Sequence, residues 1–66
     1  MKRLAELRKE KGLSQLELAE QTEVSVDSIS SYEIGRRTPT ILNLKKMATY
    51  FNVSIDYLVG YSDERQ

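Results

Sequence analysis

Apolar residues recur along this chain at intervals of three and four, the spacing that places side chains on one face of a helix. The pattern predicts five helices, over residues 2–11, 15–22, 26–34, 41–51 and 55–59. No segment alternates apolar and polar residues as a strand does. We therefore expect an all-α domain with a core of Leu4, Leu7, Leu18, Ala19, Val24, Ile29, Tyr32, Ile41, Leu44, Met47, Ala48, Phe51, Val53, Ile55 and Leu58.

Residues that start and stop helices flank these segments. A hydroxyl side chain precedes four of them and can accept a hydrogen bond from an unpaired helix N–H, at Ser14, Ser25, Thr40 and Ser54. Glu17 completes a capping box with Ser14. Glycines that suit the left-handed conformation follow three of the helices, at positions 12, 35 and 60. We expect one domain over residues 1–61 and a frayed tail over 62–66.

Composition excludes several classes of protein. Only one core is expected in 66 residues, of which 39% are hydrophobic. There is no His and no Cys, so the usual general base, thiol nucleophile and transition-metal ligands are missing. We expect no enzyme, no metal and no cofactor. No run approaches the roughly 18 to 20 apolar residues that cross a bilayer, which favours a soluble cytoplasmic protein with no membrane partner.

The second and third predicted helices are joined only by residues 23–25, too few for an antiparallel hairpin. They should cross at a wide angle as a helix-turn-helix. Ala19 is small and would let the third helix approach the second. The third helix also carries short side chains on the face expected to be exposed: Val26, Asp27, Ser28, Ser30 and Ser31. Such a face can approach another surface closely. Leu16 and Leu42 fall outside the apolar stripes, so either the helix assignment is slightly wrong there or both are on the surface.

The order of residue types in this region resembles one known family. The run from Leu13 to Ala19 reads LSQLELA, and it is followed by Val24-Ser25, Ile29-Ser30, Tyr32-Glu33, Gly35-Arg36-Arg37 and Pro39. The sequence is similar to the XRE/Cro family of helix-turn-helix DNA-binding domains, through to Gly60. The resemblance implies a compact five-helix lambda-repressor-like domain with the third helix in the DNA major groove.

The resemblance also assigns roles to individual residues. Gln15 would contact a phosphate, and Arg36 and Arg37 would grip the backbone. Arg8 and Glu33 match a buried salt bridge that ties the first helix to the end of the third. Glu23 stands where many members have Gly, at a cost of roughly 1 kcal/mol for positive φ. The positions that face bases and nearby phosphates would be Ser25, Val26, Asp27, Ser28 and Ser31, with Ser30 beside them.

The net charge of zero, from ten basic and ten acidic residues, taken alone argues against a DNA partner. By segment the picture changes. Residues 1–12 carry five bases and two acids, and residues 36–46 carry four bases and no acid. Residues 13–35 carry five acids and no base, and residues 47–66 three acids and one base. If the basic segments flank the third helix, a neutral protein can still present a positive face to DNA.

Two sets of residues have alternative interpretations. Asp27 could accept a hydrogen bond from cytosine N4, or it could only stabilise the helix dipole from the first turn. Val26 could contact a thymine methyl group. Tyr57, Val59 and Tyr61 could close the core with their polar ends in water, or form the symmetric contact of a homodimer, as this family often does.

Together these observations predict a sequence-specific transcriptional regulator, most simply a repressor, that binds double-stranded DNA at a palindromic operator as a homodimer. The rival is a protein-interaction module on the same fold, such as the antitoxin of a toxin pair. Fold alone does not separate the two.

Overall fold

The five helices begin where the sequence predicts and end within one residue of it. The computed structural model describes residues 1–65, and its helices are α1 (Lys2–Glu10), α2 (Gln15–Thr22), α3 (Val26–Glu33), α4 (Ile41–Phe51) and α5 (Ile55–Leu58). Three of them stop one residue early, because Lys11, Ile34 and Val59 serve as C-caps before the glycines. All regular secondary structure in residues 1–65 is helical, which confirms the all-α class.

The four hydroxyl caps predicted from the sequence are all present. Each side chain accepts a hydrogen bond from the backbone N–H three residues later. The capping box is also complete, with Glu17 N–H donating to Ser14 Oγ at 3.0 Å and Ser14 N–H donating to Glu17 Oε1 at 2.8 Å. All three glycines have positive φ, and at Gly35 the value of 76° turns the chain sharply after α3.

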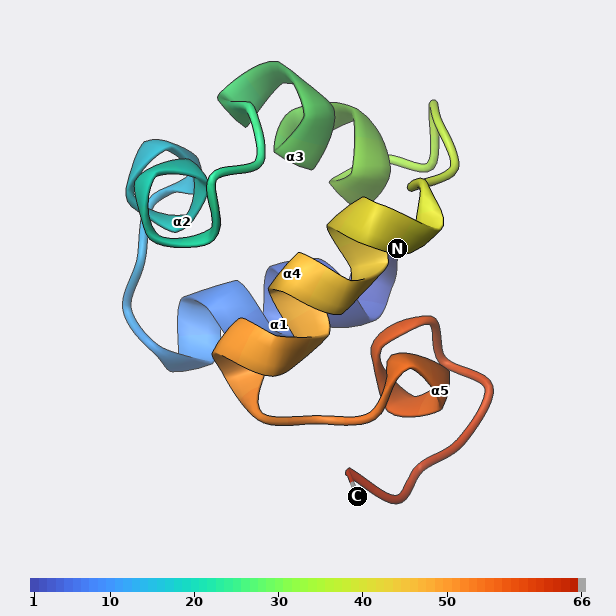
Figure 1. Cartoon of the computed structure of the whole chain (residues 1–66). Coiled ribbons are helices and arrows are strands. Elements are labelled where there is room, and N and C mark those ends of the chain that lie inside the picture. Colours follow the sequence, from blue (N-terminus) through green and yellow to red (C-terminus); the bar gives the residue numbers. More distant parts are fainter. Residues whose placement is uncertain (66) are drawn as a thin grey trace.

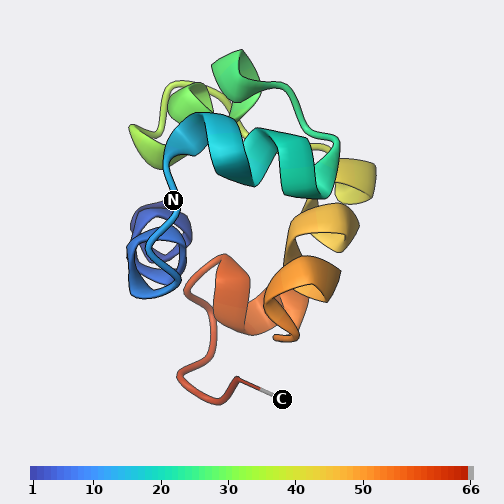
Figure 2. The same ribbon diagram turned by 90° about the vertical axis from the view of Figure 1, so that its left-hand side faces the viewer.

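Every helix contributes one side chain to the centre of the core. These five side chains are fully inaccessible to solvent, and they are Leu4, Leu18, Ile29, Met47 and Leu58. The helices close around them in a ring, as Figure 2 shows. Three other predicted core residues, Ala19, Val53 and Ile55, are only partly buried and pack against the outside of this cluster. Because the core draws on all five helices, each of them depends on its neighbours for burial.

One predicted core residue is on the surface instead. Ile41 is 67% exposed, so its assignment to the core was wrong. It is the first residue of α4, and α4 packs against α2 and α5 through its later turns, where Met47, Ala48 and Phe51 are buried. Periodicity gives the direction of a side chain but not how far the neighbouring helices extend. Leu16 and Leu42, which fell off the stripes, are 57% and 62% exposed.

The helix-turn-helix pair occupies one end of the molecule. In Figure 1, α2 is seen nearly end-on while α3 runs across the top of the view, so their axes cross at a wide angle. Both views place α3 at the top and the C-terminus at the bottom. The turn between α2 and α3 has a left-handed residue at Glu23, with φ of 59°, as expected from its replacement of Gly. Because α3 and the C-terminus lie at opposite ends of the molecule, the outer side of α3 faces away from the C-terminal end.

The structure describes residues 62–65 of the predicted tail, and several of them contact the helices. Arg65 forms an ion pair with Glu10, its Nη2 lying 3.0 Å from Oε2, and its carbonyl oxygen accepts from Ser54 N–H at 2.7 Å. Arg3 donates to the Ser62 carbonyl oxygen at 3.2 Å. These partners lie far away in the sequence, so no local pattern indicates them. Gln66, the last residue of the predicted tail, is outside the described residues.

Candidate nucleic-acid interface

The first turn of α3 lies open on the surface. Ser25 and Asp27 are exposed, Val26 is 40% exposed, and Ser28 is half-buried. The Ser25 Oγ accepts from Ser28 N–H at 3.1 Å, and the Ser25 hydroxyl donates to Ser28 Oγ at 2.8 Å. These side chains are short and partly held by one another. Another surface can therefore come close to the helix backbone here.

The second half of the predicted contact face is less accessible. Ser30 is half-buried, and Ser31 is only 5% exposed, so the assignment of Ser31 to the exposed face was wrong. Ser31 lies next to the buried Tyr32, and the loop after Gly35 covers its backbone, where Arg36 N–H and Arg37 N–H donate to the Ser31 carbonyl oxygen at 2.8 and 3.4 Å. The open part of α3 is thus confined to its first turn and cap.

The two loop arginines behave differently. Arg36 and Arg37 are both exposed, but Arg37 reaches back to the first turn of α3. Its Nη2 lies 3.3 Å from Ser28 Oγ and 3.6 Å from Asp27 Oδ2. The only acid on the open face of α3 is therefore partnered by a cation within residues 1–65. This arrangement removes much of the electrostatic objection that Asp27 raises against an anionic partner.

A nearly buried ion pair holds the other end of α3. Arg8 Nε lies 2.7 Å from Glu33 Oε2, and the two side chains are only 12% and 6% exposed. Arg8 also donates to Glu33 Oε1 at 3.0 Å and to the Leu13 carbonyl oxygen at 2.8 Å. Burial alone would raise the pKa of Glu33, but hydrogen bonds from Arg8 and Gln15 outweigh it and lower that pKa. The hydrogen bond that Arg8 donates to Glu33 raises the pKa of Arg8.

Gln15 belongs to the same network. It is the first residue of α2 and half-buried, and its amide Nε2 donates to Glu33 Oε1 at 3.0 Å. The resemblance to the family implies a phosphate contact, and also a contact with an adjacent base edge, for this side chain but not a partner within the protein. An amide nitrogen carries two N–H groups, so the contact with Glu33 leaves a second donor. Gln15, Arg8 and Glu33 join α1, α2 and α3 at one point.

Two further contacts secure the end of α3, and sequence reasoning did not find either. The α-amino group of Met1 donates to the Tyr32 carbonyl oxygen at 2.6 Å. Asn43 Nδ2, in the first turn of α4, donates to the Tyr32 hydroxyl at 2.8 Å. The periodicity places Tyr32 in the core but carries no information on which residue meets its polar end. These contacts tie α3 to the amino terminus and to α4.

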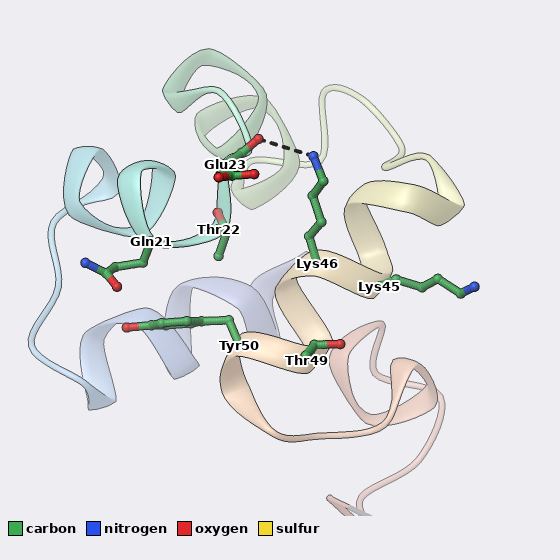
Figure 3. A pocket seen from close by; sticks show the side chains of 7 residues that line it. All are labelled: Gln21, Thr22, Glu23, Lys45, Lys46, Thr49 and Tyr50. Carbon is green, nitrogen blue, oxygen red and sulfur yellow. Dashed lines mark hydrogen bonds between the residues drawn. The ribbon is translucent and has the colours of Figure 1, made fainter.

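A shallow hollow lies behind the turn between α2 and α3, and Figure 3 shows it from close by. Its volume is about 450 Å³, and seven residues line it: Gln21, Thr22, Glu23, Lys45, Lys46, Thr49 and Tyr50. Lys46 Nζ reaches up from α4 to the Glu23 carbonyl oxygen at 3.5 Å, while Lys45 points away from the turn. Lys46 thus supports the backbone at the left-handed residue that orients α3.

The residues predicted for a dimer contact divide into two kinds. Tyr57 is half-buried, and its ring lies between two guanidinium groups, with the Cζ atoms of Arg3 and Arg65 at 4.1 and 5.3 Å from the ring centroid. Val59 and Tyr61 are 45% and 86% exposed. The structure therefore leaves Val59 and Tyr61 accessible but covers Tyr57 from within the same chain.

Other kinds of site were also sought in the described part of the chain. Residues 1–65 contain no group of three or more Asp and Glu side chains placed to hold a metal ion. None of the five helices is long and apolar enough to span a membrane. The open first turn of α3 and the two arginines that follow the helix therefore form the candidate interface.

The arrangement of α2, turn and α3 is that of a helix-turn-helix protein, and comparison with known sequences agrees. The helix-turn-helix family model matches residues 4–58. The chain belongs to this family, which confirms the resemblance to XRE/Cro domains stated from the sequence.

Several characterised and uncharacterised regulators are similar to this chain. It is 41% identical over 59 residues to the HTH-type transcriptional regulator ImmR of Bacillus subtilis, covering 89% of this chain and 46% of ImmR. It is 43% identical over 60 residues to the uncharacterised HTH-type regulator y4dJ of Sinorhizobium fredii, covering 91% of this chain and 78% of y4dJ.

A third relative is the cryptic phage CTXphi transcriptional repressor RstR of Vibrio cholerae, which is 39% identical over 66 residues, covering 97% of this chain and 59% of RstR. This chain thus spans roughly half the length of ImmR and RstR. No solved structure matches it significantly.

Proposed function

We propose that this chain is a sequence-specific DNA-binding transcriptional regulator that places the first turn of α3 in the major groove. The observation that carries the proposal is the contrast between the two ends of α3. Its first turn is exposed and carries short side chains, while its last turn is held by the nearly buried ion pair of Arg8 and Glu33. Members of the same family that carry regulator or repressor names support it. Such a surface binds rather than catalyses.

Each residue of the open face has a role that its chemistry allows. Val26 would contact a thymine methyl group, and Asp27 would accept from cytosine N4. Ser25 and Ser28 would contact phosphate or base edges, with Ser30 at the margin. Gln15 would use its second amide N–H on a phosphate, close to the positive end of α2. Arg36, which is exposed, would bind the DNA backbone.

Zero net charge is compatible with this function because the charge is unevenly distributed. Arg36 and Arg37 follow α3 directly, and Arg37 partners Asp27. The strength of phosphate binding depends on the cations at the contact surface and not on the sum over the chain. Acids elsewhere on the domain then reduce affinity only through screened, long-range repulsion.

We further propose that the chain acts as a homodimer on a palindromic operator and represses by occupying it, in the cytoplasm. Val59 and Tyr61 are exposed apolar side chains suited to a symmetric contact. A two-fold dimer would set its recognition helices about 34 Å apart, one turn of DNA. The repressor name of RstR supports repression.

The second candidate is a protein-interaction module, including an antitoxin-type partner. Leu16 and Leu42 favour it, because they are 57% and 62% exposed and a solvated helix face usually carries polar residues there.

The first test separates the two functions. The protein is titrated against random duplex DNA at several salt concentrations, and binding is measured by fluorescence anisotropy. A DNA binder loses affinity log-linearly with salt. A flat response and no binding to any duplex would exclude DNA as the partner and favour a protein.

A further inference from the structure

The position of Arg37 is unlike that of a residue that only binds phosphate. Its guanidinium reaches from the loop onto the first turn of α3, where Nη2 lies 3.3 Å from Ser28 Oγ and 3.6 Å from Asp27 Oδ2. Arg36, the adjacent residue with the same charge, is exposed and forms no ion pair with an acid among residues 1–65. The loop thus delivers one of its two arginines to the same small patch as Asp27.

We propose that Arg37 and Asp27 together read a guanine·cytosine base pair, an inference that rests on the proposed function. The two side chains place hydrogen-bond donors and acceptors side by side, an arrangement that we call the donor–acceptor row. The guanidinium offers only donors and the ionised carboxylate only acceptors. Both remain open to a partner, since their side chains are 51% and 91% exposed.

The major-groove edge of a guanine·cytosine pair is complementary to that row. Guanine N7 and O6 are adjacent acceptors, and cytosine N4 beside them is a donor. Two N–H groups of Arg37 match the first two atoms, and the Asp27 carboxylate matches the third. On an adenine·thymine pair the same register sets an Arg37 donor against adenine N6, also a donor, and Asp27 against thymine O4, also an acceptor.

The contacts within the free protein also prepare this arrangement. A guanidinium held by Asp27 and Ser28 loses less freedom on meeting a base than a free side chain does. Ser28 is itself held by Ser25, which caps the helix, so the row is linked to the start of α3. An unpartnered Asp27 would repel nearby phosphates. Its pairing with Arg37 gives an acid a place on a surface that approaches DNA.

The test uses the whole 66-residue chain and duplexes selected by it from a random pool. We expect each half-site to contain a fixed guanine·cytosine pair. Anisotropy titrations at one salt concentration then compare the selected duplex with one in which that pair is replaced by adenine·thymine. For the unaltered protein the replacement should weaken binding roughly 5- to 150-fold.

Three variants separate base reading from phosphate binding. Arg37→Ala should reduce the difference between the two duplexes to the part that Asp27 supplies. Arg37→Lys should also reduce it, because an ammonium keeps the charge but lacks the planar fork that matches guanine N7 and O6 together. The matched control, Arg36→Ala, should weaken both duplexes about equally and leave their ratio unchanged.

Two results would overturn the inference while leaving DNA binding intact. In the first, Arg37→Ala weakens both duplexes by the same factor, as expected of a phosphate contact. In the second, Arg37→Lys retains the full preference. If the unaltered protein binds no duplex from the pool, the proposed function fails and this inference fails with it.

Discussion

The two ends of α3 differ in exposure and in the contacts that hold them. Its first turn, residues 25–28, is exposed and held by contacts between short side chains and one surface arginine. Its last turn, with Tyr32 and Glu33, is fixed to α1, α2, α4 and the amino terminus by nearly buried or part-buried contacts. The comparison teaches that a short helix can be anchored at one end and keep the other free for a partner.

The largest effect should come from breaking the anchored end. Glu33→Ala leaves the guanidinium of Arg8 nearly buried and unpaired, so we expect the free energy of unfolding to fall by about 3 to 5 kcal/mol. Urea denaturation followed by circular dichroism measures it. A double variant, Arg8→Met with Glu33→Leu, removes both charges and should be close to neutral. Equal stability of Glu33→Ala and the unaltered protein would show that the pair does not anchor α3.

Acid should weaken the same end. The pKa of Glu33 is lowered in the folded chain, so folding favours its ionised form. The stability that this group adds is present above its unfolded pKa of about 4.3 and is lost as pH falls through the lower folded pKa. Urea midpoints measured from pH 6 down to pH 3 should therefore decline in the unaltered protein.

The Arg8→Met, Glu33→Leu variant isolates the contribution of Glu33 to this decline, because other carboxyls titrate as well. The hydrogen bonds from Arg65 and from Ser14 lower the pKa values of Glu10 and Glu17. The double variant should keep the part of the decline that these two cause and lose the rest. An identical pH dependence in both proteins would contradict the assignment.

A smaller effect is expected at the turn that leads into the open end. Glu23 has a φ of 59°, a conformation that costs a residue with a Cβ roughly 1 kcal/mol relative to Gly. Glu23→Gly should therefore raise the melting temperature by a few degrees. Glu23→Ala is the matched control, because it removes the carboxylate and keeps the strain, so no comparable gain should follow. A gain of the same size in both variants would point to charge instead.

The smallest effect on stability should come from the open end itself. Asp27 is exposed, so Asp27→Asn should change the free energy of unfolding by less than about 1 kcal/mol, through the helix dipole. Its effect on DNA should be larger, because an amide presents a donor as well as an acceptor and changes the preferred base. Selection from a random duplex pool measures the preference. Unchanged preference would show that Asp27 does not read a base and would limit it to the helix dipole and the ion pair with Arg37.

Helix boundaries and caps were predictable from the sequence because their causes are local. The Ser14 and Glu17 box involves residues three apart, and the left-handed conformation of Gly35 follows the end of its own helix. The resemblance to a family also predicted one contact between residues far apart in the sequence, the ion pair of Arg8 and Glu33. That contact joins residues that no local pattern connects.

Other features of the candidate site could not be predicted in this way. The burial of Ser31 depends on where the chain runs after Gly35, and the exposure of Ile41 depends on where α2 and α5 end. The contact of Arg65 with Glu10 joins residues from opposite ends of the sequence. For Ser31 and Ile41 the helix was predicted correctly, but the neighbouring element decided whether the residue is buried.

The five helices, their caps and the family follow from the order of residues alone, since periodicity, capping and residue order act over a few positions or one motif. The packed fold was needed to show which end of α3 is open, that Gln15 contacts Glu33, and that Arg37 rather than Arg36 partners Asp27. Those contacts join residues that are 18 and 10 positions apart. They exist because packing of the core brings their backbones together, and side-chain chemistry selects partners only after that.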